Sequence, residues 1–118
     1  MAVAPARYLV AVTACVSGVA HTYMAAERLE KLCQQEKWQI KIETQGALGT
    51  ENPLTEEDIE RADAVLLITD IELAGGERFM QASYVQSGIS AFLRDPNRVM
   101  SAVRRLLAAP QHTHLILD

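Results

Sequence analysis

The sequence predicts an α/β fold with one domain, in which an open parallel sheet of four strands carries helices on both faces. Two short apolar runs, Tyr8–Ala14 and Ala64–Ile68, are typical of central parallel strands that are buried on both faces. Helical segments separate the candidate strands, which indicates right-handed parallel crossovers. The chain has 118 residues, of which 49% are hydrophobic. This length suits a single domain, residues 1–118, with its core at about 7–108 and a tail at 109–118.

The first half of the chain predicts a helix, a second strand and a second helix in that order. The first helix runs from about Val19 to Gln35, and its inward stripe is expected at Val19, Tyr23, Ala26, Leu29 and Cys33. The alternation of apolar and polar residues over 38–43 predicts an edge strand with one solvated face. Thr55 and Asp58 resemble a capping box, and they predict a short helix that ends near Arg61.

The second half adds the remaining strands and the closing helix. Ala64–Ile68 is the third strand and 81–85 is the candidate fourth, followed by a helical turn or short helix over 87–93. Asp95 and the proline after it predict the start of the last helix. With 38–43 at an edge and the two apolar strands central, the expected strand order is 2-1-3-4. The tail is either frayed or docked through 115–117, and the pattern leaves both open.

Charge and hydropathy exclude several classes of function. The chain has 11 Lys and Arg against 15 Asp and Glu, a net charge of −4, and no basic stripe, so we expect no nucleic-acid partner. No apolar run approaches the roughly 20 residues of a membrane-spanning helix, so no membrane insertion is expected. The first seven residues are too short and too weakly apolar for a signal peptide, which predicts a cytoplasmic protein.

The two cysteines, Cys15 and Cys33, have different expected roles. Their spacing matches neither a zinc site nor a redox pair, so we expect no metal and no cofactor. Cys33 has the spacing of a core residue of the first helix and is expected to be buried. Cys15 follows the first strand and precedes a turn with Gly18 and the positive end of a helix dipole. A thiol there is expected to have a depressed pKa and to act as a nucleophile.

The segment around Cys15 is also the expected ligand site. Ligands of open α/β sheets bind beyond the carboxyl ends of the strands, at the point where the strand order reverses. Free backbone N–H groups of the turn and the helix start can hold a phosphoryl group. Cys15 is therefore the candidate catalytic residue. The candidate phosphate-binding residues are Val16, Ser17, Gly18, Val19, Ala20, His21 and Thr22.

Several polar residues near this segment have more than one interpretation. Ser17 either donates to phosphoryl oxygens or is an ordinary turn residue. His21 balances phosphoryl charge, shapes the loop, or is simply a polar residue of a helix start. The stretch 43–46 braces the loop, meets a partner, or is a glycine-containing loop without a role. Asp70 ends the third strand, where a carboxylate would repel a phosphoryl group unless it were paired.

The spacing of Cys15, His21 and Thr22 resembles the Cys-x5-Arg-Ser/Thr segment of low-molecular-weight tyrosine phosphatases. In those enzymes the arginine clamps two phosphoryl oxygens and stabilises the charge that develops in hydrolysis. Here His21 takes that position, and Asp70 is the sole candidate for a general acid. The segment therefore favours a site that passes a phosphoryl group on rather than one that hydrolyses it.

The segment Ala14–Glu27 resembles the active site of the fructose-type enzyme IIB domains of the bacterial phosphoenolpyruvate-dependent sugar phosphotransferase system. The resemblance covers about residues 7–90. It continues in further blocks at 43–46 with Gly49, 54–55, 59–63, 70–71 and 78–79. One departure is Val16-Ser17 where the family usually has Pro-Thr, which leaves a looser loop but keeps the hydroxyl.

The resemblance implies a phosphoryl relay. Enzyme IIA would donate a phosphoryl group from phosphohistidine to Cys15, which would pass it to a fructose-like sugar bound by the membrane enzyme IIC. The expected partners are thus IIA and IIC, and the sugar is reached through IIC. Two alternatives stay open from the residues alone: a regulatory or degenerate IIB-like module, and a small cysteine phosphatase.

Overall fold

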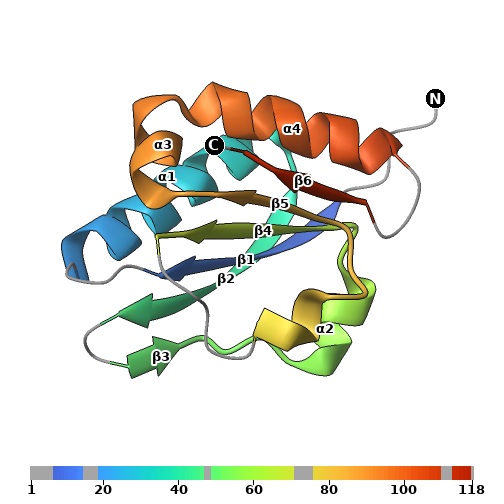
Figure 1. Cartoon of the computed structure of the whole chain (residues 1–118), viewed down its shortest axis with the longest axis horizontal. Helices are drawn as coiled ribbons and strands as arrows, with labels where there is room; N and C mark the ends of the chain where they lie inside the picture. The colour runs from blue at the N-terminus through green and yellow to red at the C-terminus, as the bar shows by residue number, and fades with distance from the viewer. Residues whose placement is uncertain (1–6, 15–18, 47–48, 71–75, 110–112, 118) are drawn as a thin grey trace.

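The computed structural model describes residues 7–14, 19–46, 49–70, 76–109 and 113–117, and of residues 19 and 20 it describes the helical backbone alone. It is an α/β structure in which one sheet lies between two layers of helices (Figure 1). The elements in chain order are β1 (Tyr8–Ala14), α1 (Val19–Glu36), β2 (Gln39–Gly46), β3 (Gly49–Glu51), α2 (Glu56–Arg61), β4 (Ala64–Thr69), the 3₁₀ helix η1 (Gly76–Phe79), β5 (Tyr84–Ser87), α3 (Ile89–Arg94), α4 (Pro96–Ala108) and β6 (His114–Ile116).

The sheet has six strands in the order β3-β2-β1-β4-β5-β6. The four predicted strands correspond to β1, β2, β4 and β5, and they are parallel and lie in the predicted order. The prediction of four strands was wrong at both edges. β3 folds back antiparallel on β2, and β6 adds to β5 in parallel, so the sheet is mixed and β2 is not an edge strand.

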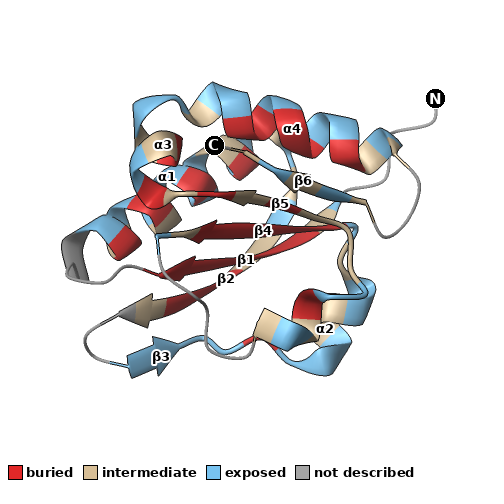
Figure 2. Ribbon diagram, in the orientation of Figure 1, coloured by how far each residue is buried: buried red, intermediate tan, exposed pale blue. Residues whose placement is uncertain are grey.

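Each face of the sheet carries its own core. Alternate residues of β1 and β4 point to opposite faces, as the period of a strand requires. One face packs on α1, α3 and α4, and it includes Leu9, Leu29 and Phe92. The other packs on the region of α2 and η1, and it includes Val10, Leu54 and Phe79. Figure 2 shows the buried residues concentrated in the central strands between these layers.

The inward stripe of α1 is rotated slightly from the one expected. Leu29 and Cys33 are buried as predicted, and they share their face with Thr22 and Ala25. Tyr23 was expected in this stripe but is only half-buried, because its hydroxyl donates a hydrogen bond to Glu51 of β3. The helix therefore presents its inward face through the small residues of its first turns, which lets it lie close to the sheet.

The ends of the helices follow local sequence signals. Thr55 and Asp58 form the predicted capping box, in which each side chain accepts a hydrogen bond from the backbone N–H of the other. The last turn of α1 closes through hydrogen bonds from Lys37 N to Gln34 O and from Trp38 N to Cys33 O, with Lys37 at φ 62°. Asp95 precedes α4 as predicted, but its side chain makes no capping hydrogen bond.

Candidate active site

The carboxyl ends of β1 and β4 meet at the point where the strand order reverses. From β1 the chain crosses to β2 on one side, and β4 then lies on the other side of β1. Ala14, the last residue of β1, is in register with Gln45 of β2 and Thr69 of β4. Such a point is where open α/β sheets bind their ligands.

The predicted nucleophile follows this point directly in the chain. β1 ends at Ala14 and α1 begins at Val19. Cys15 and the candidate phosphate-binding residues 16–18 fall between these elements and outside the described residues, as do the side chains of Val19 and Ala20. The prediction for these positions therefore remains a prediction about a segment that joins a central strand to a helix start.

The first turn of α1 suits an anion. It contains no acidic side chain, so no carboxylate of this turn offsets the positive end of the helix dipole. Thr22 is fully buried, and its hydroxyl has no hydrogen-bond partner among the described residues. His21 is exposed. The structure thus separates two of the predicted residues, with His21 toward solvent and Thr22 toward the sheet.

Among the described residues, Glu43 is the charged residue that is buried most completely, with 1% of its side chain exposed. Its carboxylate accepts hydrogen bonds from Arg78 Nη1 and Nη2, both at 3.1 Å, from Leu54 N at 2.8 Å and from Gln45 Nε2 at 2.7 Å. Burial alone would raise the pKa of Glu43, but the hydrogen bonds from Arg78 and Leu54 outweigh it and lower the pKa. Glu43 is therefore ionised inside the fold.

Asp70 lies at the end of β4 and caps the start of α3, the helix that follows β5. Its Oδ1 accepts a hydrogen bond of 2.9 Å from Ile89 N, the first residue of α3. Its own N–H donates to Ala14 O at 3.2 Å. The carboxylate considered as a general acid thus has a structural partner at the start of α3.

Cys33 is buried in the core beneath α1, as predicted. Burial raises the pKa of its thiol to about 12. A thiol with such a pKa is protonated at neutral pH and is a poor nucleophile. Cys33 therefore has no part in the chemistry expected of Cys15.

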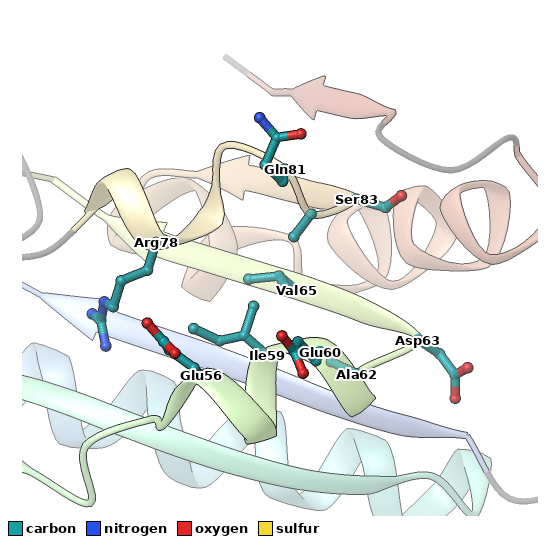
Figure 3. A pocket seen from close by; sticks show the side chains of 10 residues that line it. Glu56, Ile59, Glu60, Ala62, Asp63, Val65, Arg78, Gln81 and Ser83 are labelled. Carbon is teal, nitrogen blue, oxygen red and sulfur yellow. The ribbon is translucent and has the colours of Figure 1, made fainter.

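A hollow of about 590 Å³ lies on the α2 face of the sheet, on the side opposite to α1, between α2, η1 and the start of β5. Figure 3 shows Glu56, Ile59 and Glu60 of α2 on one side of it and Gln81 and Ser83 on the other side, with Asp63 at one end. Arg78, at the other end, extends from η1 across the sheet toward β2. The hollow is thus distinct from the carboxyl ends of β1 and β4.

The described residues contain neither a candidate metal site nor a candidate membrane-spanning helix. No three His, Cys, Asp or Glu side chains in those ranges are grouped so that they could hold a metal ion. No helix in the same ranges is long and apolar enough to cross a membrane.

Comparison with known proteins decides the family. Residues 10–102 match the family described as PTS system, Lactose/Cellobiose specific IIB subunit. The chain belongs to this family. It is therefore an EIIB phosphoryl-transfer component, a protein-phosphohistidine–sugar phosphotransferase of the phosphotransferase system, as the resemblance implied.

Individual relatives cover almost the whole chain. The PTS system fructose-like EIIB component 3 of Escherichia coli K12 is 77% identical over 111 residues, which is 94% of this chain and 98% of that protein. The fructose-like EIIB component 2 of the same strain is 47% identical over 85% of this chain and 94% of its own length. A crystal structure described as a predicted fructose-specific IIB from Escherichia coli superposes with a TM-score of 0.92 at 76% identity, covering 95% of this chain and 99% of that one.

Sequence reasoning about this EIIB chain missed the pairing of Glu43 with Arg78. Both residues stood in the blocks that resemble the family, but the partner of Glu43 lies 35 positions away in the chain. One signal could have indicated it: a glutamate on the second strand, beside a strand expected to be buried on both faces, needs a cation or several donors.

Proposed function

We propose that Cys15 carries a phosphoryl group between phosphohistidine of an EIIA protein and a fructose-like sugar held by a membrane EIIC protein. Membership in the EIIB family supports the two partners and the direction of transfer. The observation that carries the assignment to Cys15 is its place in the chain, directly after the central strand that ends at the reversal of strand order.

The chemistry consists of two in-line displacements at phosphorus. The Cys15 thiolate attacks the phosphoryl group, an S–P bond forms, and the N–P bond breaks so that the histidine of EIIA leaves with the electron pair. A sugar hydroxyl then attacks the same phosphorus, the S–P bond breaks, and the thiolate is regenerated while the hydroxyl proton passes to solvent. Such transfers need mainly alignment and stabilisation of charge on the equatorial oxygens.

The start of α1 supports the stabilisation of that charge. Backbone N–H groups of residues 16–22 and the helix dipole are expected to hold the equatorial oxygens. The lack of an acidic side chain in the first turn leaves the positive end of the dipole available to the phosphoryl group. Ser17 and Thr22 are the side chains proposed to donate hydrogen bonds to it.

The names of the relatives support the choice of sugar. The curated relatives at 77% and 47% identity are both described as fructose-like EIIB components. We propose that the relay works in the cytoplasm, as expected from the composition of the N-terminal residues.

Phosphatase activity is the less well supported interpretation of the same residues. His21 stands where a phosphatase needs its arginine, and it is exposed. Asp70 has its carboxylate engaged by Ile89 N. An aryl phosphate assay is expected to show no turnover above that of Cys15→Ser. Turnover that depends on Cys15 would instead favour the phosphatase.

The direct test is mass spectrometry of the intact protein and its peptides after phosphorylation. Wild type and Cys15→Ser are incubated with phosphoenolpyruvate, the general phosphotransferase proteins and a fructose-type EIIA. We expect one phosphoryl adduct on Cys15 in wild type and none in the variant, with both proteins folded by circular dichroism. A folded wild type without an adduct would contradict the relay and favour the regulatory module.

A further inference from the structure

Glu43 and Arg78 form a connection across the α2 face of the sheet. Glu43 belongs to β2, whereas Arg78 belongs to η1 in the connection between β4 and β5. β1 and β4 lie between β2 and β5 in the sheet. Glu43 is in register with Val12, so the connection passes over the last residues of β1 before it ends.

The hydrogen bonds of this pair fix its orientation. The two guanidinium nitrogens of Arg78 each bond a different oxygen of Glu43, which fixes the relative orientation of the two planar groups. Arg78 Nη1 also donates to Leu54 O at 3.3 Å, while Leu54 N donates to Glu43. One carboxylate thus holds β2, the residue before the cap of α2, and η1 in a single arrangement.

Stability alone gives little reason to keep such a pair. Desolvation of a buried ion pair costs about as much free energy as the pair regains, and packed apolar residues of similar volume are often as stable or more stable. What the pair adds is a defined orientation of the groups that it joins, because two parallel hydrogen bonds fix the two planar groups relative to each other.

The contacts of Glu43 lead to the end of β1. Gln45 donates to Glu43 at 2.7 Å, and its Cα is in register with Ala14, the residue immediately before Cys15 in the chain. Neighbouring strands of a sheet lie about 4.8 Å apart. The network therefore ends one strand spacing from the residue to which Cys15 is bonded.

We propose that Glu43 and Arg78 are positioning residues for phosphoryl transfer. The pair sets the placement of the carboxyl ends of β2 and β1, and through them the geometry at which Cys15 accepts and releases the phosphoryl group. This inference rests on the proposed role of Cys15. A positioning residue acts through the strands that it holds, so the proposed effect falls on the rate of transfer and not on whether Cys15 can be modified.

The test uses three changes of the pair. Arg78→Lys keeps the charge but loses the two-pronged contact, Glu43→Gln loses the charge, and the double variant Glu43→Leu/Arg78→Met replaces the pair by apolar side chains. Lys41→Met is the matched control. Lys41 is on the same face of the same strand, where it makes an ion pair of 2.7 Å with Asp58 and interacts with the charge of Glu43 at longer range. Lys41→Met therefore removes a charge from this face while the hydrogen bonds between Arg78 and Glu43 stay in place.

The measurement is single-turnover transfer from a phosphorylated fructose-type EIIA to the EIIB chain, followed by mass spectrometry at a series of EIIA concentrations. Melting temperature is measured in parallel. We expect the maximal rate of all three variants to fall about tenfold, equal to ~1.4 kcal/mol of activation free energy, with the half-saturating EIIA concentration unchanged. Lys41→Met is expected to melt lower than wild type but to transfer at the wild-type rate.

The outcomes separate this inference from the proposed function. A wild type that gains no phosphoryl group overturns the role of Cys15 itself. If wild type is phosphorylated on Cys15, a double variant with wild-type melting and wild-type rate overturns the positioning role. If the double variant does not fold, Arg78→Lys decides in its place, and a folded Arg78→Lys with the wild-type rate overturns the positioning role. An equal loss of transfer rate in Lys41→Met overturns it as well.

Discussion

Thr22 and Thr13 each bury a hydroxyl group near the carboxyl end of β1. Both side chains are fully buried, and neither hydroxyl has a hydrogen-bond partner among the described residues. A buried hydroxyl without a hydrogen-bond partner costs about 1–3 kcal/mol of stability, so packing alone does not explain why threonine stands at these positions. Side chains of a helix tilt toward its N-terminus, which directs Thr22 toward the start of α1 and toward the proposed phosphoryl site.

Replacement of Thr22 by valine separates stability from transfer. Thr22→Val keeps the volume but removes the hydroxyl, so we expect a melting temperature equal to or higher than that of wild type. We also expect the rate of Cys15 phosphorylation to fall about tenfold, equal to ~1.4 kcal/mol of activation free energy. Thr13→Val is the control, because Thr13 is equally buried but lies on β1 outside the predicted phosphate-binding segment. Equal rates in wild type and Thr22→Val would remove Thr22 from the site.

The residues of the site show where sequence reasoning reaches its limit. Cys33 could be placed in the core because helical spacing is a local signal, and the structure confirms it. The partners of Glu43 and Asp70 could not be found in this way, because Arg78 and Ile89 follow them by 35 and 19 positions. Contacts of this kind depend on where the side chains of distant segments meet in the folded chain, which no local pattern encodes.

The start of α3 depends on a contact between two elements. Its N-cap is Gly88, which has no side chain to accept a hydrogen bond, and Asp70 from the end of β4 supplies the acceptor to Ile89 N instead. A Cβ added to Gly88 would lie 2.9 Å from Asp70 Oδ1. The backbone of Gly88, at φ −72°, suits any residue, so the close approach of Asp70 is the reason for glycine here.

We expect Gly88→Ala to destabilise the protein by about 1 kcal/mol, because the new methyl group displaces Asp70 from Ile89 N. Urea unfolding of Gly88→Ala, Asp70→Ala and the double variant checks this. If the mechanism holds, the alanine at position 88 costs little once Asp70 is already gone. Additive losses in the double variant would instead place the cost in the backbone of α3.

Element length explains which parts of the fold the sequence could predict. The apolar runs of β1 and β4 and the capping box of α2 are long or specific enough to be recognised, and the structure confirms all three. β3 and β6 have only three residues each, too few for a periodic pattern to emerge. β3 was missed, and β6 was foreseen only as one of two alternatives for the tail, a stretch docked through 115–117, which the structure confirms. Pairing with a formed neighbour, rather than their own composition, makes both segments strands.

At the scale of the whole molecule, two carboxylates on the α2 face of the sheet, Glu43 and Asp58, have lowered pKa values in the folded protein. Arg78 and neighbouring donors lower the pKa of Glu43 despite its burial. Lys41 and the capping contacts with Thr55 lower the pKa of Asp58. Both groups are ionised in the folded protein at neutral pH, and both hold α2 or η1 against β2. The attachment of this layer is therefore linked to pH.

The sign of that linkage predicts acid sensitivity. In an unfolded chain Asp and Glu titrate near pH 4, at about 3.9 and 4.3. Because the folded pKa values are lower, the stabilisation is fully present above about pH 5 and is lost as the pH falls below 4. We expect the contribution of these groups to the free energy of unfolding, measured with urea, to be nearly constant from pH 7 to 5 and to fall from pH 4 to 3.

The double variant Glu43→Leu/Arg78→Met lacks one of the two linked carboxylates, so its free energy of unfolding is expected to fall less over the same pH interval. Parallel curves for wild type and double variant would show that Glu43 titrates alike in the folded and unfolded chains, and that the lowered pKa of this buried carboxylate has no role in holding η1 to β2.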